Sequence, residues 1–367
     1  MIDYKNKELA RLIASRSLII KPKTEVFIKY KSEESIQLLK QISLEISKRG
    51  GIVFTSKYNK ELEDYLLSLI SKDSINPLLE KNEFENKKFD AFVSIGSNDD
   101  FVKTPKNNQE LINEYKRRRM ELEKYKKCKQ YLLLNYPSLV DAEKMGMSYE
   151  DYYRYAMDAM TYDFNPQMDA IEELKRRMAK AEHVKIIGDN VELEFYKNNI
   201  PAVALTGNLN LPDGEVYTSP LRTSANGYIK YNVPSPKNSL IFEDITLEFR
   251  NGRVVKYKVK DNITEFEKII NIDEGARYIG EFAFGFNPKV YKPMNDILYD
   301  EKLCGSFHIA LGNAYANAYN GNFSALHWDM IYLNEMGNNC DVYFDGELVF
   351  SKGEFVPKKV RKLNLHR

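Results

Sequence analysis

The sequence is poor in the side chains that most often build metal, redox or disulfide sites. It holds four histidines, three cysteines and one tryptophan among 367 residues. The cysteines, Cys128, Cys304 and Cys340, include no Cys-x-x-Cys pair, and so sparse and odd a set does not form a disulfide framework. We therefore expect a reducing compartment, and we interpret Cys304 as a small buried residue.

Targeting and membrane-spanning segments are also missing. No stretch approaches the roughly 18 consecutive apolar residues that a transmembrane helix needs. Residues 1–20 lack a basic segment followed by an apolar segment and a cleavage site, which a secretory signal would require. These absences predict a soluble cytoplasmic protein without a membrane partner.

The chain has no excess of charge of one sign. Its 54 basic and 53 acidic residues leave a net charge of +1. A general nucleic-acid-binding protein would carry a basic excess or stripe, so we expect no nucleic-acid partner. The basic segment 108–130, with Arg117, Arg118 and Arg119, suggests such a contact, but its interleaved glutamates favour a solvated helix face.

The first half alternates strand and helix patterns. A chain of this length usually forms two domains. Residues 25–30 and 89–96 are short and rich in β-branched and aromatic side chains, which predicts strands, and 34–49 has apolar residues at helical spacing. Residues 147–160 predict a further helix with Ser148 as its N-cap. The order strand–helix–strand predicts an α/β domain with a mostly parallel sheet over residues 1–183.

The pattern changes near residue 184. Short runs bounded by Gly, Asn and Pro replace the helices, and residues 239–260 hold an Asn-Gly pair between two alternating segments, which is typical of a β-hairpin. We therefore expect residues 184–367 to form an α+β domain rich in antiparallel strands. His183 is interpreted as the end of the preceding helix, where a cation suits the helix dipole, and is given no chemical role.

The segment "SALHWDM" (324–330) is the first candidate for chemistry. If it is a strand, His327 and Asp329 lie on one face and Trp328 lies on the other. An imidazole and a carboxylate on one face suit a zinc-like ion. His308, in "GSFHIAL", also lies in a predicted strand. Each histidine taken alone is better explained as a core residue with a hydrogen-bond partner, whereas the two histidines together with Asp329 favour a site.

Two glutamates add possible metal ligands. Glu281 lies among aromatic residues between Gly280 and Gly285, and a carboxylate in such a stretch is costly to bury unless it is paired or binds a metal. Glu215 follows a Pro-Asp-Gly turn and enters a predicted strand. For Glu215 the alternative is an exposed carboxylate at the strand end.

Four ordered motifs carry a resemblance to a known family. "NLPDGEVYTSP", "YIGEFAFGFNP", "LYDEKLCGSFHIALGNAY" and "NFSALHWDM" resemble the thermophilic-type metallo-aminopeptidases, the family of aminopeptidases T and S. "YPSLVDAEKMGMSYEDYYRYAMDAM" in the first half and, more loosely, the opening segment are similar to it as well. The resemblance therefore spans nearly the whole chain.

This resemblance implies a two-metal centre in the C-terminal domain and a homodimer that encloses the site in a cavity. Tyr315 would be the catalytic tyrosine. The metal ion would be Zn²⁺, Co²⁺ or Mn²⁺, all of which accept such ligands. The implied ligands are Glu215, Glu281, His308, His327 and Asp329.

The implied activity is hydrolysis of N-terminal residues from peptides with a free N-terminus, by a water that two metal ions activate. We assign Glu281 as the carboxylate that bridges the ions, and Tyr315 as the donor to the developing oxyanion. Asp300, Glu301 and Lys302 either orient ligands or form a solvated turn. Two alternatives stay open: a two-metal hydrolase of another amide, and a non-catalytic binding protein with core histidines.

Overall fold

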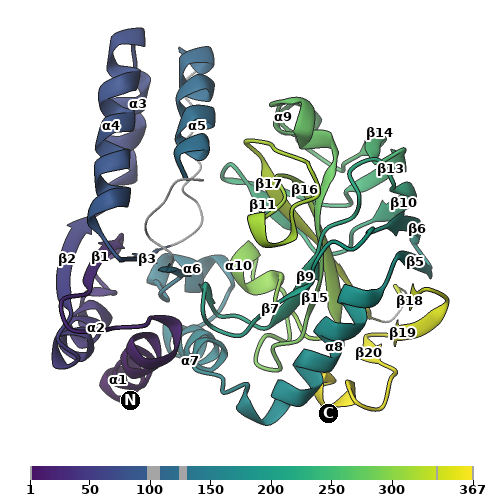
Figure 1. Cartoon of the computed structure of the whole chain (residues 1–367), viewed down its shortest axis with the longest axis horizontal. Coiled ribbons are helices and arrows are strands. Elements are labelled where there is room, and N and C mark those ends of the chain that lie inside the picture. The colour runs from purple at the N-terminus through teal and green to yellow at the C-terminus, as the bar shows by residue number, and fades with distance from the viewer. Residues whose placement is uncertain (1, 97–107, 124–129, 336–337, 366–367) are drawn as a thin grey trace. The chain divides into compact units, whose positions relative to one another are not determined.

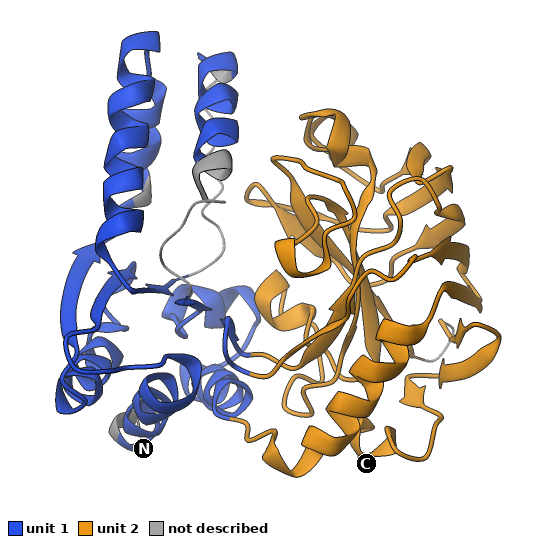
Figure 2. Cartoon of the chain, viewed as in Figure 1, with its two compact units in different colours: residues 1–161, 207–212 blue, residues 162–206, 213–367 orange. Residues whose placement is uncertain are grey.

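The computed structural model describes residues 2–96, 108–123, 130–335 and 338–365. The chain divides into two compact units: unit 1 holds residues 1–161 and 207–212, and unit 2 holds 162–206 and 213–367 (Figure 2). Within the described ranges no helix is long and apolar enough to cross a membrane.

Unit 1 is built on a five-stranded sheet in the order β2-β1-β3-β4-β8, and every neighbouring pair in it is parallel. Figure 1 labels β1, β2 and β3 of this sheet. Burial alternates along its central strands: Val26, Ile28 and Val93 are buried on one face, while Phe27 and Phe92 on the other face are partly buried. The strands are β1 (Glu25–Tyr30), β2 (Ile52–Lys57), β3 (Ala91–Ile95), β4 (Gln130–Leu134) and β8 (Asn210–Leu211). This confirms the predicted α/β fold with a parallel sheet.

Amphipathic helices accompany this sheet. In α2 (Ile36–Lys48), Leu38, Ile42 and Ile46 form the buried stripe that the periodicity predicts. Helix α7 (Tyr149–Met160) begins after Ser148, whose side chain accepts a hydrogen bond from the backbone N–H of Asp151, as predicted for an N-cap. The other helical elements are α1 (Ile2–Leu12), a π-helical turn (Ile13–Ser17), α3 (Lys60–Ser68), α4 (Lys72–Lys88), α5 (Gln109–Glu123) and α6 (Leu139–Lys144).

The basic segment 108–130 is only partly helical. Helix α5 packs on α4 through Ile112 and Tyr115, and its Arg117 and Arg119 are exposed. Gln130 belongs to β4, so the prediction of a helix that extends to residue 130 is wrong at its C-terminal end. Residues 124–129 lie outside the described part of the chain.

Unit 2 consists mainly of antiparallel sheets, as predicted. An eight-stranded sheet has the order β14-β13-β10-β6-β5-β18-β19-β20, a five-stranded sheet has the order β17-β16-β15-β9-β7, and β11 pairs with β12. The strands are β5 (His183–Gly188), β6 (Val191–Tyr196), β7 (Val203–Leu205), β9 (Glu215–Thr218), β10 (Asn226–Lys230), β11 (Ser235–Lys237), β12 (Leu240–Phe242), β13 (Thr246–Arg250), β14 (Arg253–Lys258), β15 (Ile279–Gly285), β16 (Ser306–Gly312), β17 (His327–Leu333), β18 (Cys340–Phe344), β19 (Glu347–Ser351) and β20 (Glu354–Phe355).

The core of unit 2 joins side chains of both large sheets with those of helix α8. Examples are Ile186 from β5, Phe282 from β15, Trp328 from β17 and Leu174 from α8. The helices are α8 (Met168–Lys180), α9 (Ile263–Ile270) and α10 (Ile297–Asp300), with 3₁₀ turns at Asn165–Gln167, Glu274–Arg277, Ala316–Ala318 and Arg361–Leu363. Strands β13 and β14 form the predicted hairpin around Asn251-Gly252.

The start of unit 2 is marked by helix α8 and by the strand that begins at His183. His183 does not end helix α8: Ala181 is already extended, and His183 begins β5 with its Nε2 atom 3.1 Å from Glu194 Oε2. The expected boundary between residues 183 and 184 lies after α8, whereas the compact units divide before it. Helix α8 belongs to unit 2 because its apolar face packs in that unit's core.

Candidate metal centre

Four adjacent strands of the five-stranded sheet bring the five predicted ligands to one face. Glu215 lies on β9, Glu281 on β15, His308 on β16, and His327 and Asp329 on β17. The strand register explains their convergence. Glu281, Ala310 and Asp329 form one row across the sheet, and His308 lies opposite Ala283 in the next row. Small residues therefore separate the ligand side chains.

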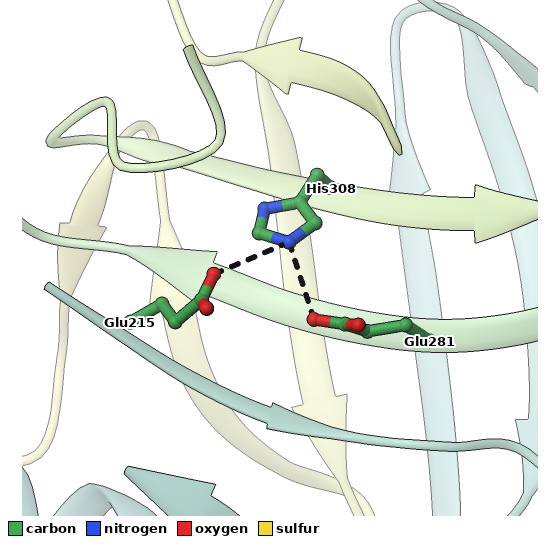
Figure 3. A group of neighbouring side chains, drawn as sticks. All are labelled: Glu215, Glu281 and His308. Carbon is green, nitrogen blue, oxygen red and sulfur yellow. Dashed lines mark ion pairs between the residues drawn. The ribbon is translucent and has the colours of Figure 1, made fainter. Parts of the chain in front are cut away.

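His308 lies within ion-pair distance of all three carboxylates, and His327 lies within this distance of two of them. His308 Nε2 is 3.5 Å from Glu215 Oε2, 3.5 Å from Glu281 Oε1 and 4.0 Å from Asp329 Oδ1; Figure 3 shows the first two pairs. His327 Nε2 is 3.5 Å from Glu281 Oε2 and 3.4 Å from Asp329 Oδ1. The structure thus brings together all five residues that the sequence singled out.

The atoms that face one another lack hydrogen bonds. Within the described part of the chain, Glu215 Oε2, Glu281 Oε2, His308 Nε2, His327 Nε2 and Asp329 Oδ1 are buried and have no hydrogen-bond partner. Buried polar atoms normally find partners, because leaving them unsatisfied costs about 1–3 kcal/mol each. Oxygen and imidazole nitrogen atoms that converge without partners fit a divalent metal ion.

These donors form overlapping groups, each compact enough to hold one ion. One group is Glu215, Glu281 and His308, and another is Glu281, His327 and Asp329; in each, the ligand atoms lie within 4.8 Å of one another. Glu281 belongs to both groups, which is the geometry that a bridging carboxylate requires. A third group contains Glu301 with His308 and Asp329.

The electrostatics of the site are dominated by the buried acids. Burial raises the pKa of Glu281 well above its usual value, and the charges of Glu215 and Asp329 raise it further. Burial acts in the same direction on Asp329, but the positive charges of His327, His308 and Lys237 together outweigh it and lower the Asp329 pKa. The two acids in turn raise the pKa of His327 to about 9 against the effect of burial. The raised pKa values of Glu281 and His327 reflect an excess of negative charge at this place, which a bound cation would offset.

A backbone carbonyl fixes the orientation of the His327 ring. Its Nδ1–H donates to the carbonyl of Asn313 at 2.8 Å, which directs Nε2 toward the carboxylates. Lys237 donates to the carbonyl of His327 at 2.6 Å. The sequence prediction missed this support, because Lys237 lies on β11, far from the recognised motifs.

Trp328 lies on the opposite face of β17, as predicted. Its ring is fully buried and packs against Phe242 and Phe266. Its indole N–H donates to Ser235 Oγ, and this hydroxyl donates to the carbonyl of Asp329. Packing on one face of the strand thereby fixes the backbone that carries the ligands on the other.

The two glycines that flank Glu281 permit close backbone approaches. A Cβ atom on Gly280 would lie 2.4 Å from the carbonyl oxygen of Asn313, the same oxygen that orients His327. A Cβ atom on Gly285 would lie 2.6 Å from the carbonyl oxygen of Glu301. Larger residues would therefore displace segments that the site needs.

The segment Asp300–Lys302 does not form a solvated turn, because all three side chains are largely or fully buried. Asp300 accepts hydrogen bonds from the backbone N–H groups of Met294 and Asp296, so it stabilises a loop. Lys302 Nζ lies 2.6 Å from Glu215 Oε1 and 2.8 Å from Glu301 Oε1. Only Glu301 and Lys302 therefore reach the site.

Tyr315 lies at the side of the donor group. Its ring centre is 4.6 Å from that of His327 and 5.7 Å from that of Tyr217. The residue is 45% exposed, but burial of its hydroxyl and the charges of the neighbouring acids raise the pKa of the phenol well above its usual value, so the hydroxyl keeps its proton.

Comparison with known proteins adds sequence relatives. Aminopeptidase AmpS of Bacillus subtilis is 28% identical over 159 residues, which cover 40% of this chain and 38% of that protein. Aminopeptidase T of Thermus aquaticus is 30% identical over 152 residues, which cover 38% of this chain and 37% of that protein. The matched stretches thus span less than two fifths of these relatives.

Two solved structures share the fold. Wild-type AmpT from Thermus thermophilus superposes with a TM-score of 0.76 at 18% identity, over 97% of this chain and all of that one. The 2,5-dihydroxypyridine dioxygenase of Pseudomonas putida has a TM-score of 0.63 at 13% identity, over 98% of this chain and 99% of that one.

One family model covers almost the entire sequence. The model of the thermophilic metalloproteases, M29, matches residues 3–355, a range that includes every strand of the candidate site. The chain therefore belongs to the thermophilic metalloprotease (M29) family.

Proposed function

We propose that this chain is a metal-dependent aminopeptidase that binds two divalent ions. The observation that carries the proposal is the set of five buried, hydrogen-bond-free donor atoms, arranged as two groups that share Glu281. Membership of a metalloprotease family and the aminopeptidases among the sequence relatives support the same activity. The proposed substrates are peptides with a free N-terminus.

Different residues would bind each of the two ions. Glu215 and His308 would hold one ion, His327 and Asp329 would hold the other, and Glu281 would serve both positions. Bound divalent ions would lower the pKa of a water molecule and polarise the scissile carbonyl. The metal stays unassigned among Zn²⁺, Co²⁺ and Mn²⁺.

Tyr315 is the proposed catalytic residue. Its position beside His327, together with the raised pKa that keeps its proton on the phenol, would allow the hydroxyl to donate a hydrogen bond to the oxyanion that forms from the scissile carbonyl. The homodimer and the cytoplasmic location stay predictions from the sequence.

The alternatives differ in what they require of the site. In a non-catalytic binding protein, His308 and His327 would be core residues with ordinary partners, which their unsatisfied Nε2 atoms argue against. A two-metal hydrolase of another amide would use the same ligands. The fold does not choose the reaction, since a dioxygenase shares it.

Metal content and substrate specificity together test the proposal. Purified protein should bind about two divalent ions per chain, lose activity on chelation and regain it when metal is returned. It should cleave aminoacyl chromogenic substrates and leave their N-acetylated forms intact, because an aminopeptidase acts at a free amine. Comparable rates on the acetylated substrates would favour the other amidase, and full activity without metal would refute the metal-dependent mechanism.

Substitution of single histidine and aspartate residues distinguishes metal ligands from residues that only support the fold. His327→Ala and Asp329→Ala should abolish activity and reduce metal content while the circular dichroism spectrum stays unchanged. His183→Ala is the matched control, because this histidine pairs with Glu194 on the other large sheet of the unit. An equal loss of metal in His183→Ala would contradict the assigned ligands.

A further inference from the structure

A lysine lies fully buried beside the candidate metal centre. Lys302 has an exposed side-chain fraction of 0%, and its ammonium is surrounded by acids: Glu215 Oε1 at 2.6 Å, Glu301 Oε1 at 2.8 Å and Asp213 Oδ1 at 3.8 Å. A buried ammonium is costly unless it is paired, so this cluster of acids accounts for its burial. The cluster does not explain why the positively charged Lys302 lies next to a site that would bind metal cations.

The two oxygens of Glu215 have different surroundings. Oε1 contacts the ammonium of Lys302, whereas Oε2 has no hydrogen bond and lies 3.5 Å from His308 Nε2 (Figure 3). A carboxylate whose one oxygen is fixed by a cation has lost the freedom to rotate about its last bond. Its second oxygen is therefore directed to the group formed with His308 and Glu281.

The backbone holds Lys302 in this place. The Lys302 carbonyl accepts a hydrogen bond from Asn287 N–H at 3.0 Å, and Asn287 donates its side-chain amide to the carbonyl of Asp213 at 2.7 Å. Gly285, which pairs with Glu215 in the sheet, leaves room for the backbone at residues 301–303. The ammonium and its carboxylates thus belong to one rigid arrangement.

We propose that Lys302 is a positioning residue, which fixes Glu215 in the orientation that binds the metal ion shared with His308 and Glu281. The inference rests on the proposed function, because it assumes that Glu215 is a ligand. Groups that orient metal ligands in this way contribute about 10–100-fold to metal affinity. Lys302 should thus act on one ion and leave the ion of the Glu281, His327 and Asp329 group largely unaffected.

The test is a Co²⁺ titration of the metal-free protein, followed by calorimetry and by the visible absorption of the bound Co²⁺. In Lys302→Met the affinity for one of the two ions should fall by about 10–100-fold, with a changed absorption band for that ion. Lys302→Gln, which keeps a donor without the charge and disturbs folding less, should weaken the same ion to a smaller degree. Wild-type affinities and spectra in either folded variant would overturn the proposal.

Lys197 provides a matched control. It is also fully buried in unit 2, but its ammonium donates to the backbone carbonyls of Ala179 and Ile200 rather than to a carboxylate. Lys197→Met should therefore leave both Co²⁺ affinities unchanged even if it lowers the melting temperature. Equal weakening of Co²⁺ binding in both lysine variants would indicate general destabilisation and overturn the specific role.

A double-mutant cycle shows whether Lys302 acts through Glu215. In a Glu215→Ala background, Lys302→Met should cause no further loss of Co²⁺ affinity, because the carboxylate that it orients is gone. An additional loss as large as that in the wild-type background would refute positioning through Glu215. Failure of the unsubstituted protein to bind Co²⁺ would instead refute the proposed function, so the two failures are distinguishable.

Discussion

Single residues of strand β17 have separate tasks on its two faces. His327 and Asp329 face the donor group, and Trp328 faces the core between Phe242 and Phe266. The alternation of a strand separates them by one residue each, so a substitution can test packing and chemistry independently.

Trp328→Ala should destabilise the protein. It removes the largest fully buried side chain and the indole hydrogen bond to Ser235, so the free energy of unfolding should fall by about 3–5 kcal/mol. Denaturant unfolding measures this loss, and turnover of the remaining folded fraction should persist. A variant that loses turnover while keeping full stability would assign Trp328 to the chemistry instead.

Tyr315→Phe should have the opposite signature. Loss of the hydroxyl should lower kcat by about 10²–10³-fold with little change in KM, because the hydrogen bond forms mainly in the transition state. Metal content should stay the same, since the phenol is not a proposed ligand. Steady-state kinetics on a leucyl substrate measures it, with Tyr319→Phe, another exposed tyrosine, as the control. A kcat equal to that of the wild type in Tyr315→Phe would show that Tyr315 serves only packing.

Among the secondary-structure elements, helix α8 shows how local charge supports the scaffold of unit 2. Glu173 accepts hydrogen bonds from Arg176 at 2.7 and 2.8 Å and from Arg177 at 2.9 Å, and Arg177 also reaches Glu347 on β19 at 2.7 Å. The side chain of Glu173 is only 10% exposed. The helix is thereby joined to the sheet beyond its apolar contacts.

Glu173→Gln should cost stability only above acidic pH. The hydrogen bonds from Arg176 lower the pKa of Glu173 from 4.5 to about 2, so its contribution is complete above pH 4.5 and is lost as the pH falls toward 2. We expect a loss of about 1 kcal/mol at pH 7, because the arginines are partly solvated. Urea unfolding at pH 7 and pH 3 measures it. An undiminished difference at pH 3 would contradict the ion-pair explanation, and Glu172→Gln, on a more exposed glutamate, is the control.

For the whole molecule, all the proposed metal ligands belong to unit 2 and none to unit 1. A ligand that binds only the folded state stabilises it by about 2.7 kcal/mol at 100 times its dissociation constant. Metal binding should therefore affect the two units differently.

Hydrogen exchange should show this difference directly. Adding metal to the metal-free protein should slow amide exchange in β9, β15, β16 and β17, whose side chains would be linked through the ions, and should change β1, β3 and β4 little. Mass spectrometry of peptic fragments measures both sets in one experiment. Equal protection of the strands of unit 1 would contradict a metal site confined to unit 2.

The sequence by itself determined features that depend on neighbouring residues. Strand alternation placed His327 and Asp329 on one face, the Asn-Gly pair located the hairpin of β13 and β14, and Ser148 marked the start of α7. The change from parallel to antiparallel architecture followed from element lengths and spacing for the same reason. Each of these depends on backbone geometry within a few residues.

Only the tertiary structure decided what depends on residues far apart in the chain. Residues 207–212 return to unit 1, where β8 extends the parallel sheet, although the surrounding sequence belongs to unit 2. Asp300, Glu301 and Lys302 are adjacent charged residues in the sequence. Asp300 nevertheless stabilises a loop, whereas Glu301 and Lys302 reach the site. The physical reason is that burial and charge pairing arise from packing between distant segments, which no local pattern encodes.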